Sequence, residues 1–350
     1  MNKAKVKTGL IGCGKVGKTH ADILSSLSTS EFVAVASRSK EHAQEFGDRY
    51  KVLWYTNIEE MLEDSGVEAI VICTPHPVHK IPAVEAAKRG IHVLVEKPLA
   101  STLDDCDEML TEAKKMQIKF GMISQRRLYP SAVRIRKAID EEKIGKPILG
   151  NITMLGWRDK NYYDSDAWRG TWDGEGGGVL VNQAPHQIDL FQWYLGPIDQ
   201  LFGYWENLNH SYIEVEDTAI AVIRFKSGAL GNIIVSNSQN PALYGKVSVF
   251  GENGASIGVQ TDSGAMFIAG MSTVTDPPLN DIWTIPGEEK NLDKWQKEDT
   301  TFFNTIDATE YFHRLQTADF LDAVIEDRQP MISAEEGRKT VERSEEHTSE

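Results

Sequence analysis

The chain has few cysteines and no long apolar run. Cys13, Cys73 and Cys106 are scattered, and no CxxC pair occurs among them. Three scattered thiols give neither a disulfide framework nor a zinc motif, so we expect no metal site. No uncharged apolar stretch approaches 18 residues, and the N-terminal residues lack the apolar segment of a signal peptide. We therefore expect no membrane contact and a cytoplasmic location.

Acidic residues outnumber basic residues in this chain. The 350 residues include 37 Lys and Arg against 52 Asp and Glu, which gives a formal net charge of −15. This excess of negative charge argues against nucleic acid as a partner. A hydrophobic content of 41% is ordinary for a globular protein, and the length favours two domains.

The first third of the chain alternates short Val- and Ile-rich segments with helical patterns. Such alternation predicts βαβ crossovers and a doubly wound parallel sheet within an α/β fold. Helices are expected over residues 18–27, 40–50, 58–64, 78–89 and 103–115.

After about residue 124 the pattern changes. Longer alternating segments, separated by turns that contain glycine, predict a large, mostly antiparallel open sheet in an α+β domain. Helices are expected at 130–142 and 185–195. The predicted domains are therefore residues 1–124 and 125–342. The final RSEEHTSE offers nothing to bury, and we expect 343–350 to be disordered or foreign to the native chain.

The segment TGLIGCGKVGKTHA places a GxGxxG turn between a predicted strand and a predicted helix. In this context Gly12 permits a tight turn, Gly14 lets the backbone approach a pyrophosphate, and Gly17 lets the helix pack closely. We predict a dinucleotide-binding turn, although a plain strand–helix connection can have the same spacing. The predicted turn comprises Gly12, Cys13, Gly14, Lys15, Val16 and Gly17.

Ser37 and Arg38 follow the second predicted strand, where an NAD site commonly has an acidic residue. A guanidinium group suits a ribose phosphate, so NADP is favoured and NAD remains possible. The alternative is that Arg38 stacks on the adenine or lies in solvent.

Two more segments end predicted strands at the edge where such sheets bind ligands. VICTPHPVH supplies Thr74, Pro75, His76 and His79, and LVEKPLA supplies Glu96 and Lys97. Burial beside a cofactor would lower the pKa of Lys97 into a range useful for proton transfer, and Pro98 can hold a cis bond. The alternative is a structural lysine.

These segments, together with GGGVLVNQAPHQIDL, resemble the Gfo/Idh/MocA oxidoreductases (glucose–fructose oxidoreductase, inositol 2-dehydrogenase and rhizopine catabolism) over residues 5 to about 342. The resemblance implies a Rossmann domain and a sheet domain through which dimers or tetramers form. It implies hydride transfer between NAD(P) and a hydroxyl or keto carbon of a sugar, glycoside or cyclitol.

The same resemblance implies that Lys97 and His186 are catalytic. Asn182 occupies a position where the family often has aspartate, and an asparagine cannot carry negative charge. Considered alone, His186 would more often be a hydrogen-bonded core residue. His210 and His313 are expected to be surface or packing residues.

Aromatic and arginine residues gather in SQRRLYP and GWRDKNYYDSDAWRGTWDGEGGG. Such rings and guanidinium groups suit the faces and hydroxyls of a sugar, while the glycines permit close approach to a ligand. A structural loop is the alternative. The candidate substrate-binding residues are Arg126, Trp157, Arg158, Tyr162, Trp168, Arg169, Asn182 and His186.

Two other functions are compatible with these features. Some proteins of the family are redox-neutral glycosidases or lyases that act through a 3-keto sugar, with the cofactor regenerated in each cycle. A non-enzymatic NAD(P) sensor is the third possibility, and the presence of both Lys97 and His186 argues against it.

Overall fold

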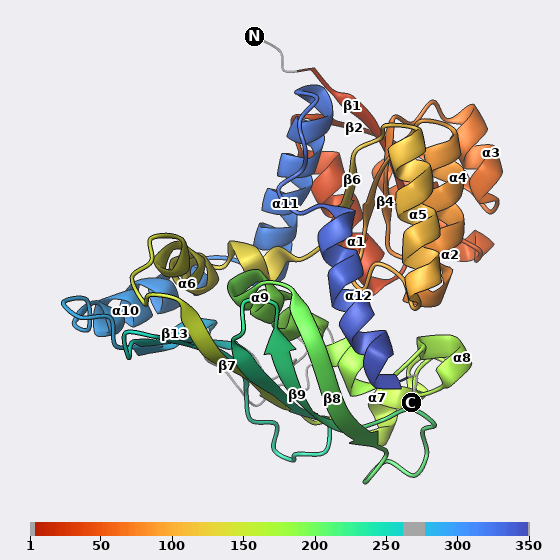
Figure 1. Cartoon of the computed structure of the whole chain (residues 1–350). Coiled ribbons are helices and arrows are strands. Elements are labelled where there is room, and N and C mark those ends of the chain that lie inside the picture. Colours follow the sequence, from red (N-terminus) through yellow and green to blue (C-terminus); the bar gives the residue numbers. More distant parts are fainter. Residues whose placement is uncertain (1–3, 262–276, 349–350) are drawn as a thin grey trace. The chain divides into compact units, whose positions relative to one another are not determined.

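The computed structural model describes residues 4–261 and 277–348, with only the backbone described after residue 342. The chain forms two compact units (Figure 1). The first contains the described residues up to Ser124 together with Thr309–Val341. The second contains the described residues of Gln125–Ala308 and those after Val341.

A six-stranded parallel sheet forms the centre of the first unit, in the order β3-β2-β1-β4-β5-β6. This order confirms the predicted doubly wound arrangement. Its strands are β1 (Val6–Ile11), β2 (Ser30–Ala36), β3 (Leu53–Tyr55), β4 (Ala69–Ile72), β5 (His92–Val95) and β6 (Phe120–Met122).

Three of the helices between these strands begin where the sequence supplies a capping side chain. Ser39, Asn57 and Thr102 each accept a hydrogen bond from a backbone N–H of the first turn of α2, α3 and α5. The connecting helices are α1 (Lys15–Ser26), α2 (Lys40–Tyr50), α3 (Ile58–Asp64), η1 (His76–Val78), α4 (Lys80–Lys88) and α5 (Leu103–Lys115).

Two C-terminal helices, α11 (Ala308–Ile325) and α12 (Ala334–Thr348), return to the parallel sheet (Figure 1). Phe320 and Leu321 of α11 join the core cluster of Leu10 and Leu24, while Val341 of α12 joins the cluster on the other face. The first unit thus takes in residues that the sequence placed in the second domain, because their apolar side chains complete its core.

Helix α12 also continues to Thr348, so residues 343–348 are helical where a disordered tail was predicted. Glu and Arg, which are frequent there, favour helix without needing an apolar surface to bury. Residues 343–348 lack apolar periodicity, but their helix propensity is sufficient for a helix.

A seven-stranded sheet forms the second unit, in the order β13-β12-β11-β7-β10-β9-β8. Only the β7–β10 pair is parallel among the described pairings, which confirms the predicted mostly antiparallel sheet. Its strands are β7 (Pro147–Leu155), β8 (Ile198–Glu206), β9 (Thr218–Phe225), β10 (Leu230–Ser236), β11 (Gly245–Gly251), β12 (Ser256–Thr261) and β13 (Leu279–Trp283).

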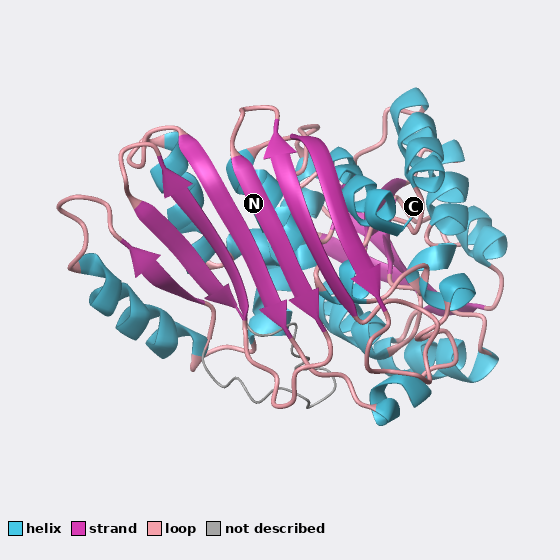
Figure 2. Ribbon diagram, turned by 60° about the horizontal axis from the view of Figure 1, so that its bottom comes forward, coloured by secondary structure: helices cyan, strands magenta, loops and turns pink. Residues whose placement is uncertain are grey.

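Helix α9 packs on one face of this sheet. Its Phe191 is fully buried and meets Phe225 of β9 edge to face, with ring centroids 5.2 Å apart. Among the described residues no helix covers the opposite face, which is turned to the viewer in Figure 2. The helices of this unit are η2 (Gln125–Leu128), α6 (Pro130–Asp140), α7 (Lys160–Asp164), α8 (Trp172–Glu175), the π-helical turn η3 (Val179–Gln183), α9 (Pro185–Leu195) and α10 (Asn291–Phe303).

No helix within the described ranges has both the length and the apolar character that crossing a membrane requires.

Glu216, just before β9, holds the π-helical turn η3 in place. The carboxyl group is fully buried, and its two oxygens accept the backbone N–H groups of Gly178 at 2.7 Å and Leu180 at 3.0 Å. Burial raises the pKa of Glu216 to about 7, and the two backbone donors oppose this rise only in part. The proton is therefore held more tightly in the folded state than in the unfolded chain.

This proton makes the stability of the fold depend on pH. The stabilisation is complete below pH 4.5, the ordinary pKa, and is lost as pH rises to about 7, a change of about 3 kcal/mol. We expect wild-type protein to lose this much unfolding free energy relative to Glu216→Gln between pH 4.5 and 8, measured by urea denaturation. Glu298→Gln, which removes a surface carboxylate from α10, is the control. Parallel pH profiles for wild type and Glu216→Gln would contradict the prediction.

Candidate functional site

The turn between β1 and α1 is fixed by two close backbone approaches. Gly12 has φ of 106°, and a Cβ there would lie 2.7 Å from the backbone of Cys73, at the end of β4. A Cβ on Gly17 would lie 2.1 Å from the carbonyl oxygen of Gly12. Both positions therefore exclude any larger residue.

Gly14 differs from its neighbours because a Cβ there would meet no atom within 4 Å. It is the N-cap residue of the 12-residue helix α1, and no side chain caps this helix end. Backbone donors and the positive end of the helix dipole thus adjoin open space, as a pyrophosphate requires. Lys15 and Val16 form the first turn of α1. The residues of the turn fit a dinucleotide.

The side chain of Cys13 does not take part in this cradle. It is buried in the core, its Sγ lies 3.8 Å from the carbonyl oxygen of Ala36, and burial raises the pKa of the thiol to about 12. Cys13 therefore contributes only its backbone to the predicted site.

Ser37 and Arg38 follow β2 beside the glycine turn. Ile11 and Ala36 are paired in the sheet, and the Gly12 N–H donates to the Ala36 carbonyl at 2.9 Å. Arg38 is exposed and Ser37 is partly buried. The structure thus brings these two residues to the same sheet edge as the turn.

The Thr74–His79 segment follows β4 at this edge, and His76 and His79 are buried. The His79 ring lies between two turns, with Nε2 2.8 Å from the Thr74 carbonyl and Nδ1 3.0 Å from the Pro98 carbonyl. Burial lowers the pKa of His79, and the carbonyl oxygens beside its two ring nitrogens oppose this shift. Its contacts are with the protein backbone, so His79 links the turns that carry Thr74 and Lys97.

Glu96 and Lys97 follow β5, and the Lys97–Pro98 bond is cis, which confirms that prediction. Glu96 is buried, with its Oε1 2.8 Å from His20 Nε2 and 3.3 Å from His313 Nε2. His313 is thus a buried partner of a candidate site residue, which its position in the sequence did not reveal. Lys97 is partly exposed.

In the second unit Asn182 lies within η3 and is held by its amide group. Its Nδ2 donates to Glu175 and, at 3.2 Å, to the Tyr162 hydroxyl. The other oxygen of Glu175 accepts the Gly170 N–H at 2.6 Å. Glu175 is buried, so a carboxylate lies one hydrogen bond behind Asn182, a feature that the sequence analysis missed.

The predicted aromatic and arginine residues form a layer around Tyr162. The guanidinium groups of Arg158 and Arg169 lie over its ring at 5.2 and 4.4 Å, and Arg169 also lies 4.4 Å from the Trp168 ring. Arg169 donates to the Tyr162 hydroxyl at 2.5 Å. Five of the predicted substrate-binding residues are therefore connected, since Arg158, Arg169 and Asn182 contact Tyr162 and Trp168 contacts Arg169.

The other candidates are more dispersed within the second unit. The Trp157 ring lies tilted against that of His210, a buried packing residue whose Nδ1 lies 2.7 Å from Asp217. Arg126 is buried in η2, and His186 is buried in the first turn of α9.

In the glycine run that precedes η3, close packing within the second unit leaves no room for a side chain at Gly178. A Cβ on Gly178 would lie 1.8 Å from the carbonyl oxygen of Glu216. The close approach here is to backbone of the same unit. The predicted role of the glycine run in approaching a ligand remains a prediction.

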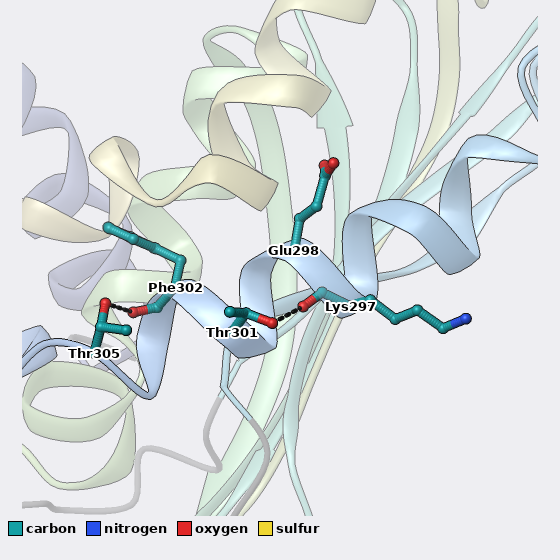
Figure 3. Close-up of a pocket in the computed structure, with 5 residues that line it drawn as sticks. All are labelled: Lys297, Glu298, Thr301, Phe302 and Thr305. Carbon is teal, nitrogen blue, oxygen red and sulfur yellow. Dashed lines mark hydrogen bonds between the residues drawn. The ribbon is translucent and has the colours of Figure 1, made fainter.

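A depression on helix α10 lies apart from these residues (Figure 3). Its lining comes from one helix end, and the Thr301 and Thr305 hydroxyls donate to carbonyls of the same segment. It contains none of the predicted site residues. The candidate residues thus remain two separate groups, Lys97 with the glycine turn in the first unit and His186 with Asn182 in the second.

The chain is similar to inositol dehydrogenases. Thermotoga maritima myo-inositol 2-dehydrogenase is 30% identical over 257 residues, which cover 71% of this chain and 74% of that protein. The NAD(+)-dependent scyllo-inositol 2-dehydrogenase of Bacillus subtilis is 26% identical over 72% of this chain and 73% of its own.

Solved structures share the fold. The WlbA dehydrogenase of Bordetella pertussis, in complex with NADH and UDP-GlcNAcA, has a TM-score of 0.85 and 25% identity over 99% of this chain and 97% of its own. Residues 6–123 match the model of the oxidoreductase family with an NAD-binding Rossmann fold, and residues 132–257 match the GFO/IDH/MocA C-terminal domain. These matches cover most of the chain, which therefore belongs to the Gfo/Idh/MocA oxidoreductase family.

Proposed function

We propose that the protein is an NAD(P)-dependent oxidoreductase that acts on a hydroxyl or keto carbon of a sugar, glycoside or cyclitol. The observation that carries this proposal is the β1–α1 turn, where two glycines are sterically obligatory and a third faces open space at a helix N-terminus. The similarity to inositol dehydrogenases supports the substrate class. The nicotinamide, when bound, accepts or returns the hydride.

The chain's own residues have three tasks in this proposal. Gly12–Gly17 hold the pyrophosphate and Ser37 and Arg38 the adenosine ribose. Asn182 and the layer around Tyr162 bind substrate hydroxyls. Lys97 and His186 move the hydroxyl proton, since an ammonium or imidazole group can exchange it near neutral pH.

The hydrogen bond from Asn182 to Glu175 determines which atom of Asn182 the substrate meets in this proposal. Asparagine itself brings no charge, but the buried carboxylate behind it fixes the amide orientation. With Nδ2 directed to Glu175 and Tyr162, we propose that Asn182 presents its amide oxygen, which has two lone pairs, to a substrate hydroxyl. The role of Asn182 is thus to accept a hydrogen bond.

Removing either proton-transfer group tests the proposal. Lys97→Ala and His186→Ala should each lower kcat by about 10²- to 10⁴-fold, because general acid–base catalysis contributes this much. Dissociation constants for NAD and NADP, measured by calorimetry, should change little. Lys115→Ala and His42→Ala, at exposed positions of the first unit, are the matched controls.

The assay follows the absorbance of reduced nicotinamide with monosaccharides, inositols and glycosides. Near-normal turnover in both variants would refute the assignment. Cleavage of a chromogenic glycoside without stoichiometric reduced nicotinamide would instead establish the redox-neutral glycosidase function.

We further propose that NADP is the preferred cofactor, since the exposed Arg38 guanidinium can pair with a ribose phosphate. Arg38→Ala should lower kcat/KM for NADP by about 10- to 100-fold, the loss expected for a charged hydrogen bond, and change the value for NAD much less. Lys115→Ala controls for the lost charge. Wild-type preference for NAD would overturn this part.

The open face of the second sheet supports self-association as part of the proposed function. Phe202 and Val222 are cross-strand partners, as are Tyr204 and Ile220, and these side chains are between 51% and 77% exposed. A contiguous apolar face of this kind marks an interface, and a second copy of the chain offers the same face to it. We propose a homodimer or homotetramer that uses this face.

Charge on this face should prevent the association. The double substitution Phe202→Lys and Tyr204→Lys should shift the protein to monomer in sedimentation equilibrium, because a charged face cannot be desolvated at low cost. Ile81→Lys, at an exposed apolar position of α4, should leave the oligomer intact. A monomeric wild type, or an unchanged oligomer in the double variant, would contradict the proposal.

A cytoplasmic location is also part of the proposal. Its support is that Cys13 and Cys73 are free thiols, as is usual in a reducing compartment.

A further inference from the structure

Three side chains from distant segments meet just before Lys97. His20 comes from α1, Glu96 from the end of β5 and His313 from α11, and all three are buried in the first unit. Both imidazole Nε2 atoms face the same oxygen, Glu96 Oε1, and the two rings meet edge to face with centroids 5.3 Å apart. This arrangement constrains which atoms carry protons.

The protonation of His313 follows from its two contacts. Its Nδ1 lies 2.6 Å from the Thr309 carbonyl oxygen, which can only accept, so Nδ1 carries a hydrogen. Its Nε2 lies 3.3 Å from the Glu96 carboxylate. In a neutral ring this second nitrogen would direct a lone pair at a carboxylate oxygen. Both contacts are favourable only when His313 is an imidazolium.

His20 has a different protonation state. Its Nε2 donates to Glu96 Oε1 at 2.8 Å, while its buried Nδ1 has no hydrogen-bond partner among the described residues. Burial lowers the pKa of His20, which favours the neutral ring. Burial alone would raise the pKa of Glu96, but the bonds from His20 and His313 hold it well below 4.5. The cluster therefore contains one negative and one positive charge.

The second carboxylate oxygen connects this cluster to Lys97. Glu96 Oε2 accepts the backbone N–H of Lys97 at 3.1 Å. On the other side of the lysine, the Pro98 carbonyl contacts His79. We propose that the buried Glu96–His313 ion pair is the positioning device for Lys97, so that helix α11 determines how well the lysine works. This inference rests on the proposed catalytic role of Lys97.

A metal ion is the competing interpretation, since the three donor atoms lie within 4.8 Å of one another. A metal-bound imidazole normally donates its other N–H to an acceptor. His313 has such an acceptor, whereas His20 Nδ1 has none among the described residues. The separation of 2.8 Å between His20 Nε2 and Glu96 Oε1 is also that of a hydrogen bond. The geometry favours the ion pair.

The first measurement uses the intact wild-type protein. In ¹⁵N-histidine-labelled protein near neutral pH, long-range proton–nitrogen spectra should show both ring nitrogens of His313 protonated and only one in His20. Comparison with His313→Gln assigns the signals. A neutral His313 overturns the proposal, as does one equivalent of tightly bound metal found by elemental analysis and lost to a chelator.

The second measurement separates positioning from general stability. His313→Gln should lower kcat by about 10- to 100-fold, the effect of displacing a catalytic group by about 1 Å, with KM and cofactor affinity near wild type. The double variant Glu96→Gln, His313→Gln should regain part of this loss, because no uncompensated buried charge remains. His42→Gln on the exposed side of α2 is the control.

The outcomes distinguish the two proposals. Full turnover in Lys97→Ala refutes the function of the lysine and with it this inference. An inactive Lys97→Ala together with wild-type kcat in His313→Gln refutes the positioning role alone. If His313→Gln does not fold, the wild-type ring signals are assigned through their scalar couplings to the labelled backbone, and these spectra then decide the protonation state.

Discussion

The first unit depends on the close approach of backbone to backbone at the end of β1. With no Cβ on Gly12, the chain passes against Cys73 at the end of β4, and with none on Gly17, helix α1 can turn back against Gly12. This approach fixes the starting point and direction of α1. His20, one turn after Gly17, is thereby carried to Glu96 at the end of β5. The cradle for phosphates and the support of Lys97 thus follow from one steric constraint.

In the second unit, buried carboxylates perform the comparable task. Glu216 accepts the N–H groups that open the π-helical turn, and Glu175 accepts the amide of Asn182 within it. A π-helical turn is frequent at functional sites, because its irregular backbone re-aims side chains. Here it lies immediately before α9, which carries His186 in its first turn. Two acidic side chains therefore maintain the backbone on which the second candidate group is placed.

Much of this arrangement could be predicted because it is encoded locally. Helices over 40–50, 58–64, 103–115 and 185–195 begin and end as predicted, since caps, periodicity and flanking strands act within a few residues. The glycine turn and the residues after β4 and β5 were identified for the same reason. The predicted roles in binding and catalysis remain predictions.

The partners of these residues could not be predicted from spacing. His313 meets Glu96 from α11, more than 200 residues away along the chain, and nothing in its neighbourhood distinguishes it from a packing histidine. Glu175 and Glu216 occur among many acidic residues, and only tertiary burial selects them. The short strands β3 and β13 and helix α10 also lacked a clear sequence pattern. Long-range burial, rather than local propensity, determines each of these features.

The return of α11 and α12 to the parallel sheet has a consequence for how the protein folds during its synthesis. A chain released from the ribosome up to Ser124 has all six parallel strands, yet it lacks the residues after Thr309 that close both sides of the core. The nucleotide-binding unit can be completed only after the whole of the other unit has been synthesised. The segment that leaves the ribosome first is therefore among the last to reach its final fold. A fragment that ends at Ser124 lacks part of the core of the first unit.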